Sequence, residues 1–203
     1  MFRLAFETYR AARKLGLSLD IVAPDADLSG YSLVLAPGLL ETPKSLETFH
    51  GTALIGPRTG SKTSELSIPT PMGPNITGLD CTSVRVQSLP PTCNIPLENG
   101  GCFKHWLEDL EGNAEIALRT KAGAPAIMRA GTLHYMAGWP EADTYVDILE
   151  TLAHQAGLKT QRLPDGLRIR DTPTHRFWFN YAPDDIEFEG RTIKSADIQI
   201  ETH

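Results

Sequence analysis

Two different spacings of apolar residues run along this chain. At the start, apolar side chains recur every three or four positions, at Phe2, Phe6, Tyr9, Ala12 and Leu15. This spacing predicts one buried face of a helix, which Gly16 ends because glycine readily adopts the left-handed conformation. A second helix is predicted over residues 141–156, before Gly157. Its expected core face consists of Tyr145, Ile148, Leu149, Leu152 and Ala156.

Short apolar runs between the two helices predict strands. They cover residues 17–22, 31–36, 52–55, 81–88, 102–110, 114–120, 125–129 and 132–137, with a short helical patch at 44–50. Helices that alternate with short strands are typical of a parallel α/β sheet. Beyond Gly157 the pattern becomes purely β, with strands predicted at 167–169, 176–181, 186–188 and 198–200. We therefore expect an α/β domain over residues 1–160 and a small antiparallel β domain over 161–203.

Composition and charge argue against two classes of partner, nucleic acids and membranes. The chain has 203 residues, of which 41% are hydrophobic and 22% charged, and a formal net charge of -6. A negative chain is a poor binder of phosphate backbones, so nucleic acid is not expected as the main partner. No apolar run approaches the about 20 residues that span a bilayer, so no membrane is expected. Cys81, Cys93 and Cys102 show no paired spacing, which favours a reducing, cytoplasmic location.

One turn concentrates residues suited to contacts. The buried strand at 52–55 is followed by a Gly- and Pro-rich turn, Gly56-Pro57-Arg58-Thr59-Gly60-Ser61-Lys62. Turns after the strands of an α/β sheet form the edge at which such folds place their sites. This turn carries no nucleophile. Its candidate contact residues are Arg58, Ser61 and Lys62.

Several segments in order resemble the trimerisation domain of family 42 β-galactosidases. The first is Tyr9-Arg10-Ala11-Ala12-Arg13-Lys14-Leu15-Gly16-Leu17 with Asp20-Ile21-Val22, and the second is Asp25-Ala26-Asp27-Leu28-Ser29-Gly30-Tyr31 with Leu33-Val34-Leu35-Ala36-Pro37. The turn at residues 56–62 is the strongest match, and Ser88-Leu89-Pro90-Pro91 and Trp106 also fit. Residues 163–167 and 177–181 resemble the family's small C-terminal β domain.

The resemblance implies a class I glutamine amidotransferase-like, flavodoxin-like doubly wound sheet followed by a small antiparallel β domain. The family's catalytic glutamates lie on a (β/α)₈ barrel, which needs about 200 to 250 residues and does not fit beside the segments assigned above. No catalytic residue is therefore expected in this sequence. The family's first strand is not matched either. We expect a rearranged edge, a partner's strand or a separate barrel chain to replace it.

Other chemistries find little support in the residues. An amidotransferase needs a cysteine at a strand-to-helix elbow, and the turn at 56–62 contains none. The segment 134–141 is faintly similar to the amidotransferase motif that supplies the histidine, but Trp139 occupies the position of that histidine. The six histidines lack metal-binding spacing, so neither metal nor cofactor is expected. Asp25/Asp27 and Asp184/Asp185 lie in turn-like segments. The group Glu108, Asp109 and Glu111 is interpreted as solvated charges near a strand end.

Aromatic residues raise the possibility of a sugar-binding surface. Residues that could stack on sugar rings are Trp106, Trp139, Phe177, Trp178, Phe179 and Tyr181. Phe177 and Phe179 share one face of a predicted strand, and Trp178 points to the other face. One face is expected to be core, and Trp178 is interpreted as a candidate for the exposed one.

The sequence thus predicts a non-catalytic oligomerisation or accessory portion of a β-galactosidase, inactive alone. It could be a separate subunit, a truncated product or a remnant. Its expected partners are further copies of itself, as a trimer or dimer, or a separate catalytic-barrel chain, with the long excursion at residues 57–96 as the candidate interface. Two competing classes remain: a small amidotransferase-like enzyme with an unrecognised cysteine site, and a sugar-binding module.

Overall fold

The computed structural model describes residues 2–202, so Met1 and the last of the six histidines, His203, lie outside the described residues. The helices are α1 (Phe2–Lys14), α2 (Ala142–Gln155) and the 3₁₀ turn η1 (Lys44–Leu46). The strands of the first part are β1 (Leu33–Ala36), β2 (Thr52–Ile55), β3 (Thr82–Ser88), β4 (Ile95–Pro96), β5 (Cys102–Glu111), β6 (Glu115–Arg119), β7 (Pro125–Ala130), β8 (Leu133–Met136) and β9 (Gly138–Pro140). The last part holds β10 (Leu167–Asp171), β11 (His175–Asn180), β12 (Ile186–Phe188), β13 (Arg191–Ile193) and β14 (Ile198–Thr202).

The centre of the first part is a five-stranded sheet with the order β1-β2-β8-β7-β6. Strands β1, β2 and β8 run parallel, whereas β7 and β6 are antiparallel to their neighbours. All four residues of β2 are buried, as expected for a central strand flanked on both sides. Because β1 pairs directly with β2, this sheet is continuous from the chain's own strands. No gap between β1 and β2 is therefore left for a partner's strand, and of the expected replacements a rearranged edge fits this arrangement.

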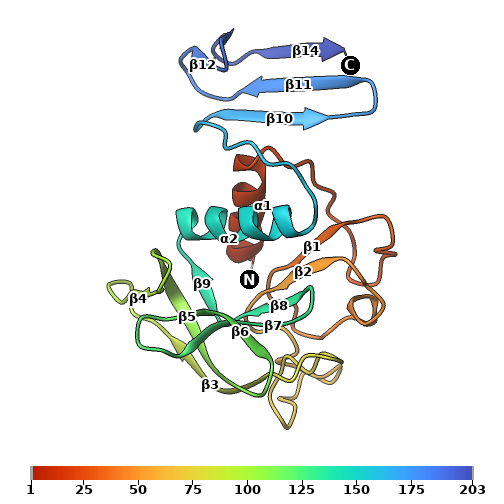
Figure 1. Cartoon of the computed structure of the whole chain (residues 1–203), viewed down its shortest axis with the longest axis vertical. Coiled ribbons are helices and arrows are strands. Elements are labelled where there is room, and N and C mark those ends of the chain that lie inside the picture. Colours follow the sequence, from red (N-terminus) through yellow and green to blue (C-terminus); the bar gives the residue numbers. More distant parts are fainter. Residues whose placement is uncertain (1, 203) are drawn as a thin grey trace.

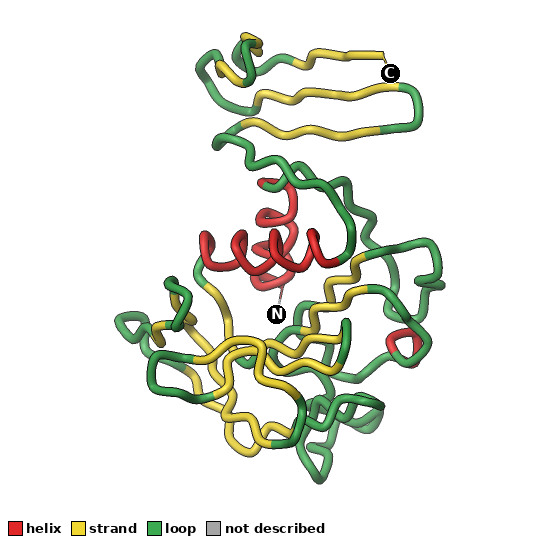
Figure 2. The backbone as a smooth tube through the Cα atoms, in the orientation of Figure 1, coloured by secondary structure: helices red, strands yellow, loops and turns green. Residues whose placement is uncertain are grey.

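Both long helices lie on the same side of this sheet, between it and the C-terminal strands (Figure 1). A second sheet, β3-β5-β4 with β9 paired to β5, extends the first part on the opposite side from the C-terminal strands. The coarse prediction is confirmed: a sheet with helices is followed by a small antiparallel β part. The chain is mostly β-strand and loop, with few helical turns (Figure 2), so it does not clearly show the helix layers of a doubly wound fold.

Helix α1 forms where predicted but buries only part of the predicted face. Its buried residues are Leu4, Thr8, Ala11, Ala12 and Arg13, and Leu15 follows them into the core. Ala12 and Leu15 are thus buried as predicted, whereas Phe2, Phe6 and Tyr9 are 87%, 50% and 42% exposed, so the aromatic part of that face is wrong. The buried face of α1 packs against α2. The Thr8 and Tyr145 hydroxyls lie 2.6 Å apart in a hydrogen bond across that contact.

Of the remaining predicted elements, some are confirmed by the structure and others are not. Helix α2 buries Tyr145, Ile148, Leu149 and Leu152 as predicted, although Ala153 replaces Ala156 in the core. Both Gly16 and Gly157 have positive φ after their helices, which confirms their role as helix ends. Residues 17–22 form no strand, and the helical patch at 44–50 shrinks to η1. Strands β4, β9 and β13 were not predicted.

The C-terminal part has its own small core. Strands β10, β11 and β14 form one sheet and β12 and β13 a hairpin, around Leu163, Leu167, Ile169, Trp178 and Ile193. Trp178 is only 2% exposed, so its interpretation as a solvent-facing residue is wrong. Phe177, Phe179 and Tyr181 instead stack along the opposite face, with ring centroids 6.2 and 6.0 Å apart. That face also carries the exposed side chains of Ile198 and Ile200.

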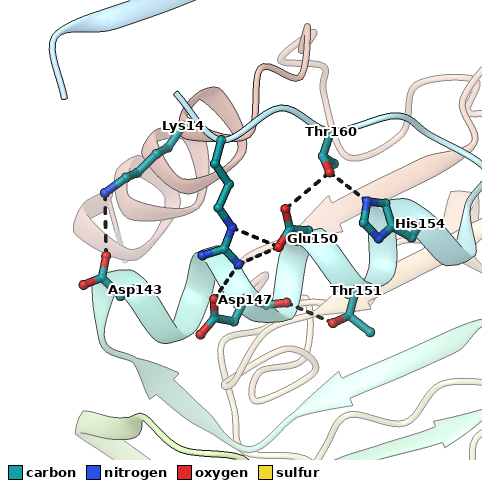
Figure 3. Close-up of polar contacts among 8 residues, drawn as sticks. Lys14, Asp143, Asp147, Glu150, Thr151, His154 and Thr160 are labelled. Carbon is teal, nitrogen blue, oxygen red and sulfur yellow. Dashed lines mark hydrogen bonds and ion pairs between the residues drawn. The ribbon is translucent and has the colours of Figure 1, made fainter. Parts of the chain in front are cut away.

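A polar network fastens the segment between the two parts to helix α2 (Figure 3). Arg162 donates to Asp147 (2.7 Å) and to Glu150, and its hydrogen bond to Glu150 holds the pKa of that carboxylate below its usual value. Thr160 bridges Glu150 and His154. The connector is therefore held along the helix, although its exposed ion pairs contribute little stability each.

Candidate functional site

The turn at residues 56–62 lies at the end of the parallel strands, beside the segment that follows β1. Gly56 N–H donates to Ala36 O (2.9 Å), and Gly60 N–H donates to Leu39 O (3.1 Å). The Thr59 hydroxyl donates to Gly56 O (3.0 Å) and accepts from Leu39 N–H (3.2 Å). These hydrogen bonds hold the backbone of the turn in one conformation. The turn and residues 37–39, which follow β1, together form the predicted edge of the sheet.

Gly60 allows this turn to pack against the long excursion. Its φ is +67°, and a Cβ built on it would lie 2.4 Å from Pro74 O. Gly73 meets the turn from the other side, since its own Cβ would lie 2.6 Å from Gly60 O. No side chain fits between two backbones this close, so glycine is required at both places.

Beneath the turn lies a buried carboxylate, Glu108 of β5, which is 3% exposed. Its Oε1 accepts the Arg58 backbone N–H (2.7 Å) and the Trp106 indole N–H (3.0 Å). Its Oε2 accepts the Tyr135 hydroxyl (2.6 Å) from β8. Glu108 therefore joins the turn, the second sheet and the central sheet, and its interpretation as a solvated charge is wrong.

Burial sets the protonation behaviour of this cluster. Loss of solvent raises the pKa of Glu108, and the three hydrogen bonds oppose that rise only in part. Burial and the nearby Glu108 carboxylate also raise the pKa of Tyr135 well above its usual value. Tyr135 thus remains a protonated donor at neutral pH.

The raised pKa of Glu108 predicts a pH dependence of stability. In the interval above the ordinary value of 4.5, the native state holds a proton that the unfolded state has released. This contribution to the free energy of unfolding is therefore present at low pH and is lost as pH rises through the native pKa, at no more than about 1.4 kcal/mol per pH unit. The Glu108→Gln variant does not titrate there.

Urea unfolding of both proteins from pH 4 to pH 8 measures this effect. The stability advantage of the wild type over Glu108→Gln is expected to shrink as pH rises. A Glu111→Gln variant, which changes an exposed carboxylate of the same strand, serves as the control with a nearly constant difference. An advantage that grows with pH contradicts the prediction.

Of the three predicted contact residues, Arg58 lines a small cavity. Its guanidinium lies over the Trp106 ring, 4.9 Å from the centroid, at a hollow of about 80 Å³. The lining residues are Leu4, Gly38, Pro57, Arg58, His105, Trp106 and Trp139. Ser61 and Lys62 stand in the same turn but outside this lining, and the buried Ser61 Oγ has no hydrogen-bond partner among residues 2–202. Sequence reasoning missed Glu108, Tyr135 and His105; the alternation Trp106-x-Glu108 on one strand was the available signal.

Cys81 and Cys102 lack the environment that activates a nucleophilic cysteine. Cys81 is buried, which raises the pKa of its thiol to about 12, and burial also raises the pKa of the Cys102 thiol. A nucleophilic cysteine needs the opposite shift, toward the thiolate. The geometry around these two thiols therefore favours a structural role.

A larger hollow of about 760 Å³ lies between residues 24–28 and 39–48. Asp27 at its rim accepts the Ser29 N–H and hydroxyl (both 2.9 Å), which confirms the predicted Asx turn. Across residues 2–202, no group of three potential metal ligands comes together. No described helix is long and apolar enough to cross a membrane.

Comparisons with known proteins agree on one family. Residues 4–159 match the β-galactosidase trimerisation domain. A β-galactosidase of Thermus thermophilus is 38% identical over 194 residues, and one of Halorubrum lacusprofundi is 31% identical over 196 residues. These alignments cover 91% and 79% of this chain but only 30% and 28% of the two relatives.

Solved structures show the same partial coverage. The β-galactosidase of the psychrophilic Marinomonas ef1 superimposes with a TM-score of 0.92 and 32% identity, over 98% of this chain and 33% of that one. This chain therefore spans about a third of the proteins that it resembles. Since the family match covers most of the sequence and the fold agrees with it, this chain belongs to the β-galactosidase trimerisation domain family.

Proposed function

We propose that this chain acts as a non-catalytic assembly domain, which associates with copies of itself and with the catalytic barrel of a β-galactosidase. The match of residues 4–159 to a trimerisation domain carries this proposal. In a ring of three copies, one surface of each chain contacts a different surface of the next. Such an arrangement needs two complementary surfaces on each chain, and exposed apolar residues are candidates for both.

Exposed apolar residues supply surfaces of that kind. In the excursion at residues 57–96, Leu66 and Ile68 are 68% and 64% exposed. On α1, Phe2 and Phe6 are exposed as well. Large apolar side chains gathered on a surface mark interaction sites in soluble proteins. We assign the excursion to the contact between copies, with Arg58, Ser61 and Lys62 at its base.

The proposal includes the layout of the chain. Residues 1–160 form the assembly domain, and residues 161–203 form a small β domain with a separate core. The parallel strands β1, β2 and β8 are the part that corresponds to an amidotransferase-like, flavodoxin-like sheet. Within this layout we expect no turnover of a chromogenic galactoside by the chain alone.

The mass in solution tests the assembly. Light scattering of the pure chain is expected to give three times the 22.2 kDa of one chain, and Leu66→Asp with Ile68→Asp is expected to lower that mass. Ile21→Asp is the matched control, because Ile21 is 88% exposed but lies outside the excursion. A monomer at all concentrations, both alone and mixed with a barrel domain from a relative, contradicts the proposal. Galactoside turnover that a point mutation in this chain abolishes contradicts its non-catalytic part.

A further inference from the structure

We infer that the hollow beside Arg58 is a binding site for a single carboxylate group. This inference stands on the geometry of the hollow and does not depend on the proposed assembly. The ligand is a small carboxylate from solution or the side chain of an aspartate or glutamate on another protein surface.

The first observation is a guanidinium without a hydrogen-bond partner. Within residues 2–202, the Arg58 side chain makes no hydrogen bond or ion pair; it lies over the Trp106 ring and interacts electrostatically with the buried Glu108 carboxylate. Its backbone N–H is already used by Glu108. The N–H donors of the guanidinium therefore remain free, and their planar fork matches the two oxygens of a carboxylate.

The second observation is backbone strain at this hollow. Arg58 and His105 have φ values of +71° and +63°, which side-chain-bearing residues rarely adopt. His105 lies where the pairing of β5 with β9 shifts register between Lys104 and Leu107. Strain of this kind concentrates at functional sites, where it aims a side chain. Here both strained residues contribute to the same lining.

The third observation concerns size and charge. A volume of about 80 Å³ corresponds to two or three water molecules, which suits a carboxylate and one carbon more than a sugar ring. The Trp106 and Trp139 rings give the ligand's apolar end a surface to lie on. Trp139 is itself held in place, because His105 contacts its ring edge-on at 5.4 Å and Glu7 accepts its indole N–H.

Neighbouring acids restrict the ligand further. Glu108 and Glu7 accept the indole N–H groups of Trp106 and Trp139, so two carboxylates lie behind the lining and oppose any anion in the hollow. This repulsion is smaller for a carboxylate of single charge than for a phosphate of double charge. Of these two anions, the carboxylate is therefore the one that the pairing with Arg58 can hold.

A titration with acetate tests the inference, because Trp106 and Trp139 line the hollow and their fluorescence reports binding. Sodium acetate is compared with sodium chloride at equal ionic strength, and galactose is tested separately. The wild type is expected to show a saturable change in tryptophan emission with acetate alone. Arg58→Asn is expected to weaken this binding about tenfold or more, which corresponds to the loss of one charge-assisted pair.

The variants are chosen to keep the fold. Asparagine tolerates a left-handed backbone and keeps the N–H that bonds Glu108, and a melting curve checks this directly. Arg58→Lys keeps the charge but not the fork and should bind acetate with intermediate affinity. Arg85→Gln is the matched control, since Arg85 is an exposed arginine on β3 outside the lining, and it should change the affinity less than about twofold.

Light scattering in the same buffers distinguishes the two sources of the carboxylate. If acetate lowers the mass of the wild type, and Arg58→Asn starts from that lower mass, the carboxylate belongs to another copy. If acetate binds without any change in mass, the ligand is a small carboxylate from solution. If the protein is a monomer and still binds acetate, the result supports this site and contradicts the proposed assembly. The inference is overturned if wild type and Arg58→Asn behave alike in both measurements, or if galactose alone gives the saturable response.

Discussion

Replacement of Glu108 by alanine is expected to lower the free energy of unfolding by about 3–5 kcal/mol. The carboxylate accepts hydrogen bonds from the Arg58 backbone, the Trp106 indole and the Tyr135 hydroxyl. Alanine leaves these three donors without an acceptor in a region that is mostly closed to water. Each buried donor without a partner costs about 1–3 kcal/mol, and a water molecule that enters the space compensates only in part.

Urea unfolding at neutral pH measures this loss. Glu108→Gln retains one acceptor oxygen and should lose about 1–2 kcal/mol, so the two variants rank by the number of donors left unpaired. Glu111→Ala, on the exposed end of the same strand, should stay within about 0.5 kcal/mol of the wild type. If Glu108→Ala is as stable as Glu111→Ala, Glu108 does not hold the turn in place.

Replacement of Gly60 by alanine is expected to destabilise the protein by about 3–4 kcal/mol or more. Two costs combine at this position. The φ of +67° disfavours any residue with a Cβ, and the added Cβ would lie 2.4 Å from Pro74 O and 2.9 Å from Pro74 C. Because both atoms belong to the backbone, the excursion itself must move away from the turn.

Gly78 provides the matched control for this prediction. Its φ is +84°, and a Cβ built there meets nothing within 4 Å. Gly78→Ala is therefore expected to lower the free energy of unfolding by only about 1–2 kcal/mol, the cost of a left-handed backbone at a residue with a Cβ. The difference between the two variants isolates the close approach of the turn to Pro74. Equal melting temperatures of Gly60→Ala and Gly78→Ala would show that this approach is not required for the fold.

The Gly56–Lys62 turn shows how far sequence reasoning reached. Its place after a buried strand and its role as the edge of the sheet were predictable, because a fully apolar run followed by Gly and Pro has few other solutions. Arg58 was singled out as a contact residue, and it does line a hollow. Its partners were not predictable, since Trp106 and Glu108 arrive from a strand about fifty residues later.

Helix α1 illustrates a different limit. The spacing of its apolar residues was interpreted correctly as helical, and Ala12 and Leu15 are buried as predicted, but the three aromatic residues of the predicted face are exposed. Leu4 and Ala11 also lie at helical spacing from Ala12 and Leu15, so the sequence allows two overlapping apolar faces. The contact with α2, a helix more than a hundred residues later in the chain, decides between them.

Trp178 and Glu108 were misjudged for the same reason. Strand alternation correctly separated Trp178 from Phe177 and Phe179, but it cannot say which of the two faces meets a core. A carboxylate beside two other acids is usually solvated, and only the donors that converge from β8 and the turn make burial of Glu108 favourable.

The sequence by itself determined most of the local elements and the family of this chain, because these follow from short-range spacing and from motifs in a recognisable order. The tertiary structure alone decided which faces are buried, the order in which the strands of the central sheet pair, and which side chains surround Arg58. Those outcomes depend on contacts between residues far apart in the chain, where packing and the pairing of buried polar groups outweigh local preference.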